Sequence, residues 1–347
     1  MTIKEATEQF HWIKVAEDEA IELYLDHHAL STFRMCEAHF ELSHIRKYGA
    51  RGRTPWPLAF GIVFHKVVEY IYQSKAIDNF DPDTLVRVAS AMWNEADLDY
   101  YKDHKTYQAL CGQAGFIALV LQYTSFYSGE AERLRPIATE IAFGKAKEVP
   151  LGEFYLVPGQ FLGETLYSQH PVKVRCYLTG RIDFLMDSGT AIGPMDHKTS
   201  AFFKGDPLAN FEPQEGMTGY VLATKHIIQQ NFPELAAKRR LDRMWMNFIQ
   251  VKNEPDNNKR FKRIPLFKTE WQLEQYKLRQ LSTYRRILDL AISGRAADWN
   301  TSVCNNYWHQ PCQFKNVHRQ GSESAAFLIL NQDFEIKPAW DPETVED

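Results

Sequence analysis

Two short charged segments constrain this chain more than any other feature. The first is Gly-Arg-Ile-Asp-Phe at residues 180–184, and the second is Asp-His-Lys-Thr at residues 196–199. Apolar and β-branched residues surround the charges, so each segment is expected to form a strand, and Asp-Ser-Gly at residues 187–189 supplies a tight turn between them. The sequence therefore predicts a β-hairpin that carries Asp183, Asp196 and Lys198.

The spacing of these charges predicts a metal site. Side chains alternate along a strand, so Asp196 and Lys198 share one face, about 6–7 Å apart. If the hairpin register brings Asp183 beside Asp196, the two carboxylates repel unless a divalent cation lies between them. Oxygen ligands with open positions for water and phosphate suit Mg²⁺ or Mn²⁺. Such an ion activates water, and the lysine orients it, so the implied reaction is phosphodiester hydrolysis.

The alternative is that these charges are solvated. Aspartate and lysine two residues apart on an edge strand are usually surface groups. Here Ile192, Pro194 and Met195 lead directly into the charges, which indicates a buried strand. A charged cluster at the end of a buried strand is more often functional.

The two segments resemble the signature of the PD-(D/E)XK nuclease superfamily, in its RecB-like or CRISPR-associated-exonuclease-like branch. Three further segments match that branch in the expected order. They are the opening helix at residues 30–36 with Phe40 after it, a GxxxHxxxE helix at residues 61–69, and Glu-Ile-Ala-Phe at residues 140–143. The resemblance covers roughly residues 30–320.

The resemblance implies an α/β fold with a restriction-endonuclease-like core, in which helices flank a mixed central sheet, and an N-terminal helical elaboration. Periodicity agrees, predicting helices near residues 30–45, 57–74, 82–98, 106–128, 215–231 and 269–293, and strands near 138–198, 242–251 and 260–266. We expect residues 1–135 to form the helical part and residues 136–347 the nuclease core with a cysteine-containing C-terminal segment. The two parts are expected to pack as one continuous domain.

The same resemblance assigns metal ligands. Asp183 and Asp196 would hold Mg²⁺ or Mn²⁺, His65 would complete the site, and His197 would contribute its backbone carbonyl. Lys198 would activate or position the attacking water. A lone histidine on an apolar helix is more often a packed core residue, and the family match favours the ligand role for His65.

Other residues are assigned by their positions near these motifs. Glu140, on the first core strand, would tune the site or accept a hydrogen bond from Lys198. Arg181 and Thr199 would contact nucleic acid, although a strand arginine beside an acid more often forms an ion pair.

The helix after the second motif departs from the family pattern Q-x-x-x-Y. Tyr220 is present, but Gly216 stands four residues before it and the nearest glutamine is Gln214. Six helical steps put two side chains on different faces. Either the helix begins after Gly216 and Gln214 reaches the nucleic acid from a loop, or the role of the glutamine is lost.

The cysteines leave a second metal site open. Five cysteines, an odd number, without a signal peptide favour a reducing compartment over a disulfide scaffold. Cys36, Cys304 and Cys312 fall where iron–sulfur members of the branch carry cluster ligands, and His318 stands at the fourth position. The alternatives are an iron–sulfur cluster, a structural zinc, or a metal-free closure.

The charge distribution is uneven. The net charge is -4, yet nine lysines and arginines and three acids occur between residues 238 and 264, and a smaller basic run lies between residues 46 and 53. Basic runs are usually solvated faces; next to a phosphodiesterase site they predict salt-dependent contacts with a nucleic-acid backbone. No apolar run is long enough to span a membrane, so we expect a cytoplasmic protein of a bacterial or phage-infected cell.

These features together predict a metal-dependent DNA nuclease. The expected activity is that of an exonuclease acting in recombination, repair or phage DNA processing. Its partners would be DNA ends and a helicase or recombination protein. One alternative is a catalytically silent nucleic-acid-binding scaffold on the same fold. Another is a CRISPR-type spacer-processing nuclease, which predicts an intact iron–sulfur cluster.

Overall fold

The structure, a computed structural model, describes residues 3–130, 133–156, 171–203, 205–212, 214–304, 311–338 and 342. It divides into two compact units, each assembled from separate stretches of chain. Unit 1 comprises Met1–Gly52, Ala142–Gly180 and Trp271–Asp347, and unit 2 comprises Arg53–Ile141 and Arg181–Glu270. The division expected near residue 135 does not coincide with either unit.

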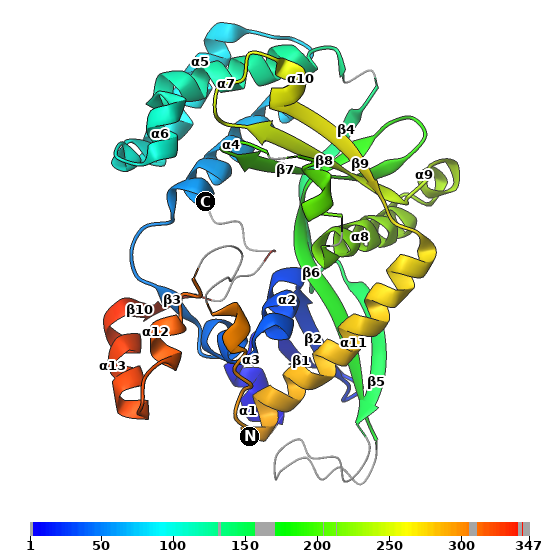
Figure 1. The fold of residues 1–347 in the computed structure, drawn as a ribbon. Coiled ribbons are helices and arrows are strands. Elements are labelled where there is room, and N and C mark those ends of the chain that lie inside the picture. The colour runs from blue at the N-terminus through cyan, green and yellow to red at the C-terminus, as the bar shows by residue number, and fades with distance from the viewer. Residues whose placement is uncertain are drawn as a thin grey trace. The chain divides into compact units, whose positions relative to one another are not determined.

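Unit 1 contains a mixed sheet. Strand β1 (Ile13–Val15) pairs antiparallel with β2 (Ile21–Asp26), and β2 runs parallel to the first part of β6 (Val172–Asp187). Strand β5 (Val149–Leu156) pairs antiparallel with the same part of β6 (Figure 1). The first residues of the chain therefore include strands, where the sequence pattern predicted a helical part. The cause is the run Ile21–Asp26, whose first five residues are all buried.

The long helix α11 (Glu270–Ser293) is held to this sheet by a buried tyrosine. The Tyr284 hydroxyl accepts a hydrogen bond from the Leu25 N–H (3.1 Å) and donates to the Tyr177 carbonyl (2.5 Å). Both partners lie on paired strands, so a single side chain joins the helix to β2 and β6. Leu273, Ile287 and Leu288 of the same helix are buried as well.

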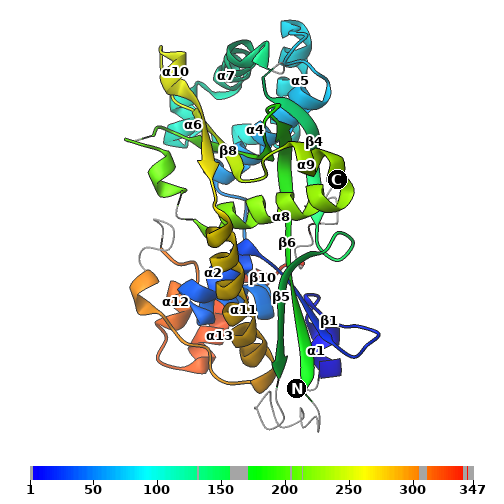
Figure 2. The same ribbon diagram turned by 90° about the vertical axis from the view of Figure 1, so that its right-hand side faces the viewer.

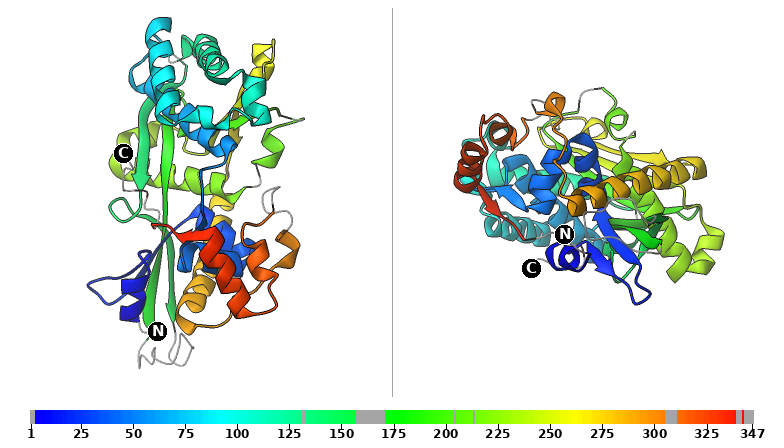
Figure 3. Two further views of the ribbon diagram at one scale, coloured as in Figure 1. Left: turned by 90° about the vertical axis from the view of Figure 1, so that its left-hand side faces the viewer. Right: turned by 90° about the horizontal axis from the view of Figure 1, so that it is seen from below.

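Short elements complete unit 1. They are α1 (Ile3–Gln9), α2 (His27–Met35), α3 (Glu37–Phe40), a π-helical turn (Glu41–Ile45), β3 (Tyr48–Ala50), α12 (Lys315–His318), α13 (Glu323–Asp333) and β10 (Phe334–Ile336). Strand β10 pairs antiparallel with β3. Leu42 packs with Phe314, Val317 and Leu330 in a separate apolar cluster, so the C-terminal helices, orange to red in Figure 3, join the N-terminal part of the chain.

Unit 2 also has a mixed sheet. The end of β6 pairs antiparallel with β7 (Ile192–Ser200), β7 runs parallel to β8 (Arg243–Gln250), and β8 pairs antiparallel with β9 (Phe261–Phe267). Strand β4 (Arg135–Phe143) also pairs with β6. The helices are α4 (Trp56–Gln73), α5 (Pro82–Glu95), α6 (Lys105–Leu110), α7 (Gly112–Tyr127), α8 (Glu215–Asn231), α9 (Pro233–Lys238) and α10 (Asn257–Arg260).

Helices cover both faces of this sheet. Phe184 and Met195 pack into a large core with residues of α4, α5 and α7. Leu185 and Ile192, on the opposite face, pack against Ile228 of α8 and the neighbouring α9 (Figure 2). This alternation follows from the strand period of two, with successive side chains on opposite faces. The expected α/β core, a mixed sheet flanked by helices, is confirmed.

The predicted turn of the hairpin is also confirmed. The Asp187 carboxylate accepts the Gly189 N–H (2.7 Å), and the Ser188 N–H donates to the Ala191 carbonyl (2.9 Å). Arg239 of the segment after α9 donates to the same carboxylate at 3.0 Å. Asp187 thus fixes both the turn and its attachment to the unit.

None of the helices in the described part of the chain combines the length and apolar character needed to cross a membrane.

The pairing of β7 with β8 gives a first prediction. A Cβ added at Gly193 would lie 2.1 Å from the Arg243 carbonyl oxygen of β8, so Gly193→Ala must push the strands apart. We expect a loss of about 3 kcal/mol in the free energy of unfolding, at the upper end for overpacking. Urea denaturation measures it. Gly321→Ala, where an added Cβ meets nothing within 4 Å, is the matched control, and equal losses for the two variants would contradict the prediction.

Candidate active site

The register of the hairpin brings the two predicted acids together. Phe184 of β6 lies opposite Met195 of β7, so one further step places Asp183 across from Asp196. Both carboxylates line one small space, together with Tyr220 of α8. Their side chains are 25% and 12% exposed. Two partly buried carboxylates therefore meet where the hairpin strands diverge, as the sequence predicted under its register assumption.

Lys198 lies on the same face as Asp196 and forms an ion pair with it. Its Nζ atom is 2.9 Å from Oδ1 and 2.8 Å from Oδ2 of Asp196. Burial alone lowers the pKa of this lysine, but the charges of Asp196 and Asp183 outweigh burial and raise the pKa above its usual value. Lys198 therefore stays a cation at neutral pH and acts as a hydrogen-bond donor.

His65 of α4 bridges the second acid and the second strand. Its Nδ1 is 3.3 Å from Oδ2 of Asp183, and its Nε2 is 2.8 Å from the backbone carbonyl of His197. Burial lowers the pKa of His65, but the nearby carboxylates outweigh this effect and raise it. Both ring nitrogens face oxygen acceptors, so the protonated ring satisfies both contacts.

A glycine one turn earlier explains how α4 reaches β7. A Cβ added at Gly61 would lie 3.5 Å from Oγ1 of Thr199, so the helix backbone runs close to the strand at this point. Because i and i+4 lie on one helix face, the approach at Gly61 also sets the position of His65. Thr199 packs toward α4, whereas its neighbour Lys198 faces the acids.

Glu140 of β4 is a third acid near the pair. Its φ of +48° is unusual for a residue other than glycine, and such conformations occur often at functional positions. Its Oε2 is 3.4 Å from NH1 of Arg181. Burial and the charges of Asp183 and Glu69 raise the pKa of Glu140 to about 7. The structure thus pairs Glu140 with Arg181, and Lys198 with Asp196, rather than Glu140 with Lys198.

A fourth carboxylate stands one turn after His65 on α4. Glu69 accepts a hydrogen bond from Gln73 at 2.7 Å, and Gln73 also donates to Thr139 at 2.8 Å. Burial raises the pKa of Glu69, and the charge of Asp183 adds to this effect. Asp183 acts on both Glu69 and Glu140, and Asp196 of β7 lies across from Asp183, so the four carboxylates form a cluster of the kind that a divalent cation relieves.

The donor set fits a hard divalent ion. Carboxylate oxygens, a backbone carbonyl and one imidazole suit Mg²⁺ or Mn²⁺. Within the described ranges, no group of three or more histidine, cysteine, aspartate or glutamate side chains is already spaced around a common centre for a metal. His65 and Lys198 form ion pairs with Asp183 and Asp196, so a bound cation would compete with both pairs.

The ring of His197 belongs to a buried network that the sequence interpretation missed. Asn247 of β8 donates to Nδ1 of His197 at 2.7 Å and to the Tyr123 hydroxyl at 2.8 Å, and it accepts from the Tyr127 hydroxyl at 3.1 Å. Burial, followed by the charge of His65, lowers the pKa of His197 far below its usual value, so the ring is neutral. The sequence feature that could have indicated this network is Asn247, an amide among the apolar residues of β8.

Arg263 of β9 extends this network. It forms an ion pair with Glu130, donates to the hydroxyls of Tyr72 (3.0 Å) and Tyr123 (3.3 Å), and lies 4.0 Å from the ring centroid of Tyr127. Buried arginines of this kind support the core and are not available to DNA.

Other cations between residues 238 and 264 also have partners within the protein, some of them at its surface. Arg239 pairs with Asp187, Arg240 and Arg243 pair with Asp242, and Lys259 pairs with Asp256. Arg260 donates to the carbonyls of Gln250 and Val251. The smaller run behaves similarly, since Arg46 pairs with Glu41, Arg51 donates to the carbonyls of Phe334 and Asn331, and Arg53 pairs with Asp97. Arg243, Arg260 and Arg263 are largely buried, so the charge count overstated the open cationic surface by these residues, whereas Arg240 and Lys259 remain 66% and 70% exposed.

Helix α8 begins before Gly216, not after it as one of the two alternatives from the sequence required. Its first residue is Glu215, so Gly216 lies inside the helix and Gln214 is the residue before it. Tyr220 lines the space shared by Asp183 and Asp196. The structure therefore brings Tyr220 to the acids and places Gln214 at the start of the helix.

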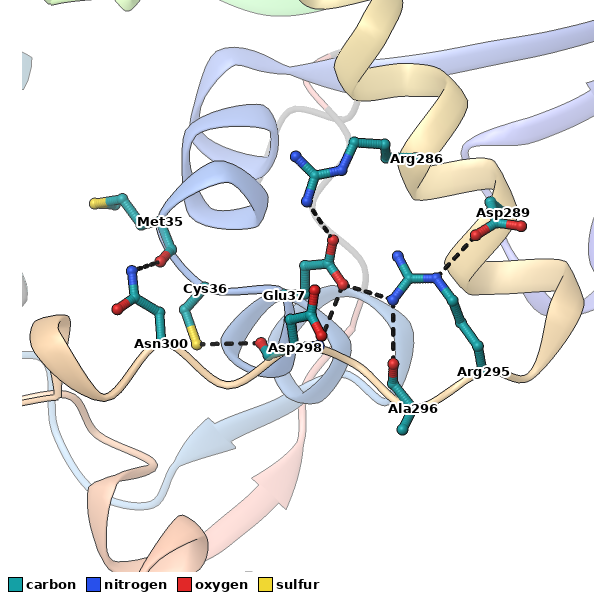
Figure 4. Close-up of polar contacts among 9 residues, drawn as sticks. All are labelled: Met35, Cys36, Glu37, Arg286, Asp289, Arg295, Ala296, Asp298 and Asn300. Carbon is teal, nitrogen blue, oxygen red and sulfur yellow. Dashed lines mark hydrogen bonds and ion pairs between the residues drawn. The ribbon is translucent and has the colours of Figure 1, made fainter.

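Cys36 lies in unit 1, at a junction organised by a buried carboxylate (Figure 4). Glu37 accepts hydrogen bonds from Arg286 (2.6 Å), Arg295 (2.7 Å) and the Asp298 N–H (3.2 Å). The Sγ atom of Cys36 is 4.0 Å from the Asp298 carbonyl. Glu37 thus fastens the segment after α11 beside the end of α2.

The other proposed cysteine-site residues lie nearby in the same unit. Cys304 accepts a hydrogen bond from the Trp299 ring at 3.2 Å, and the His318 ring lies 5.1 Å from that of Trp299. Cys312 is buried, and its Sγ is 3.4 Å from Nδ1 of His39. The histidine in contact with Cys312 is thus His39, which the sequence interpretation did not name. An iron–sulfur or zinc site here stays a prediction.

The pKa of Glu140 predicts a pH dependence. Its folded-state pKa, about 7, exceeds its ordinary value of 4.5, so this group favours the folded state most below pH 4.5 and loses that contribution as pH rises through 7. We expect Glu140→Gln to remove this dependence. Urea denaturation in EDTA from pH 4.5 to 8 measures it, with the exposed Glu234→Gln as control. Parallel pH curves for wild type and Glu140→Gln would contradict the assignment.

The buried network predicts a large effect at Asn247. Asn247→Ala leaves the Tyr123 and Tyr127 hydroxyls and the His197 ring without their amide partner, and we expect a loss of about 2–3 kcal/mol in unfolding free energy. Asn258→Ala, an exposed asparagine of α10, should cost far less. Equal denaturation midpoints for the two variants would show that the network contributes nothing.

The family model for the PD-(D/E)XK nuclease superfamily matches residues 25–317, which include His65, the hairpin and all four acids. No curated protein matches the chain. The match covers most of the chain and contains the cluster that the hairpin register assembles, and the chain belongs to the PD-(D/E)XK nuclease superfamily.

Proposed function

We propose that this protein is a divalent-metal-dependent deoxyribonuclease of the RecB-like branch, acting as an exonuclease. The observation that carries the proposal is the convergence of Asp183, Asp196, Lys198 and His65 at one end of the β6–β7 hairpin. Four chemically complementary groups from three elements meet there. Family membership supports the nuclease activity, and the donor set supports the metal dependence.

Each residue has a role that follows from its contacts. Asp183, Asp196, His65 and the His197 carbonyl would hold Mg²⁺ or Mn²⁺. When bound, the ion supplies an activated water and neutralises charge on a phosphoryl oxygen. Lys198, held as a cation by Asp196, donates hydrogen bonds to the attacking water or to the developing negative charge.

The remaining site residues contact substrate or adjust the acids. Glu140 tunes the charge of the cluster, and Arg181 beside it is placed to meet a phosphate when that ion pair opens. Tyr220 lines the space at the acids and would contact DNA. Gln214 would contact DNA from the start of α8, whereas the packing of Thr199 against Gly61 favours a structural role for the threonine.

The biological setting in this proposal is recombination, repair or phage DNA processing, with DNA ends as substrate and a helicase or recombination protein as partner. A CRISPR-type nuclease is the variant of the proposal in which Cys36, Cys304, Cys312 and His318 hold an iron–sulfur cluster. Iron and zinc analysis of purified protein separates these alternatives, because only the cluster gives stoichiometric iron.

A second candidate, a catalytically silent DNA-binding scaffold, is favoured by one observation. The ion pairs Lys198–Asp196 and His65–Asp183 neutralise both acids from within the protein. A scaffold would keep these pairs closed and bind DNA without cleaving it.

Digestion of end-labelled linear DNA and closed circles, with Mg²⁺, Mn²⁺ or EDTA, tests the proposal. We expect metal-dependent cleavage of linear DNA, sparing of circles, and a loss of about 10²–10³-fold in rate for Lys198→Ala, because a donor to the developing charge is removed. DNA binding should persist in this variant. Lys225→Ala is the matched control, since Lys225 also forms a lysine–carboxylate pair in unit 2.

The outcomes divide the candidates clearly. Cleavage of circles would make the enzyme an endonuclease. Wild-type protein that binds DNA but leaves every substrate intact under both metals would establish the scaffold. Equal cleavage by wild type and Lys198→Ala would show that another group performs the role given to this lysine.

A further inference from the structure

Unit 2 contains a cavity of about 920 Å³ to which the proposed nuclease chemistry gives no role. Its walls come from the end of α4 and the residues after it, the end of α7, and the first half of β4. This volume lies in the range of pockets that enclose small ligands. The lining includes Gln73, Lys75, Ile77, Arg135, Ile137 and Thr139.

The cavity adjoins the acids of the candidate active site. Gln73 lines the cavity and donates to both Glu69 and Thr139, so one amide joins its wall to the carboxylate cluster. Thr139 precedes Glu140 on β4. Gln73 follows His65 by eight residues of one helix, a rise of about 12 Å. A nucleic-acid strand that crosses the acids therefore reaches the cavity within one or two nucleotides.

The charge of the cavity differs from that of the neighbouring cluster. Lys75 and Arg135 line it with one acid, Asp78, whereas the neighbouring cluster contains Glu69, Glu140, Asp183 and Asp196. Arg135 contacts Asp187 through one nitrogen at 3.4 Å. Its side chain is nevertheless 70% exposed, so most of the guanidinium remains open to a ligand. The carboxylates of the neighbouring cluster repel a phosphate group unless a metal is bound. In the cavity, Lys75 and Arg135 attract it.

The rest of the wall suits a flat heterocycle. Pro136, Ile137 and Ala138 supply apolar surface, and Gln73 and Ser128 supply polar groups for the edges of a base. Lys75 follows α4 with a φ of +58°, which turns the chain sharply at the rim. Cations, apolar walls and a few polar groups together match a nucleotide, which combines an anion with an apolar ring face.

We propose that this cavity binds one nucleotide of the substrate strand close to the cleaved bond, with its base between the apolar side chains and its phosphate at Lys75 and Arg135. The inference rests on the proposed nuclease function and adds a substrate subsite to it. An enzyme that holds a base beside the acids favours single-stranded or frayed ends, because a paired base is not free to enter a cavity.

Binding in EDTA tests the proposal without requiring cleavage. The probe is a fluorescent single-stranded oligonucleotide, titrated with wild type, with Lys75→Ala/Arg135→Ala, and with the control Lys102→Ala/Lys105→Ala, which removes two exposed cations elsewhere in unit 2. We expect about tenfold weaker binding for the cavity variant, and a salt slope lower by about 0.7 for each phosphate that the variant no longer neutralises. The control should bind like wild type.

A scan with single abasic sites, moved one nucleotide at a time from the labelled end, tests the base. We expect one position at which removing the base weakens wild-type binding by about tenfold, in the range for the stacking of one base. In the cavity variant the effect at that position should shrink, because the nucleotide is no longer seated.

The results separate the two proposals. A uniform abasic profile, or equal affinities for the cavity and control variants, overturns the nucleotide cavity even if metal-dependent cleavage is observed. A single sensitive position with weakened binding in the cavity variant supports the cavity even if no cleavage occurs, in which case only the nuclease proposal fails.

Discussion

The register of the β6–β7 hairpin is the constraint on which the site depends. Phe184 opposite Met195 places Asp183 across from Asp196, and a slip of one residue would turn one acid to the other face of the sheet. Buried side chains on both faces of the sheet resist such a slip, because it would turn the apolar side chains of one strand from the cluster on one face to the cluster on the other. The Asp187 turn fixes the same register from its closed end, so fold stability and site geometry share one cause.

The acids are tolerated because three of the four have a cation beside them. Lys198 neutralises Asp196, His65 neutralises Asp183, and Arg181 stands near Glu140. Bringing carboxylates together raises the free energy of the folded state, and these pairs offset part of it. A divalent cation would compete with the same pairs. The charge balance therefore couples metal binding to the opening of these ion pairs.

Sequence patterns reached the hairpin, the helix of His65, α8 and α11, because strand alternation, turn residues and apolar periodicity are local signals. They missed β2, because β6, the strand that runs parallel to it, lies about 150 residues later in the chain. They also assigned the basic run to DNA, since a count of charges does not show that Arg263 and Arg260 are buried among internal acceptors. The partners of Asn247 were hidden for the same reason: a buried amide is visible in a sequence, but its hydroxyl and imidazole neighbours come from other elements.

His197 shows how the core can determine the precision of the site. Its ring is locked by Asn247 inside the sheet, while its carbonyl faces His65 at 2.8 Å. Ring and carbonyl belong to one residue, so the tyrosine network behind the sheet limits the movement of the oxygen in front of it. Asn247 therefore acts on the site through His197 without touching the acids. A catalytic group that is displaced by a fraction of an ångström loses much of its effect. The geometry needed for cleavage therefore depends also on Asn247, which contacts none of the acids.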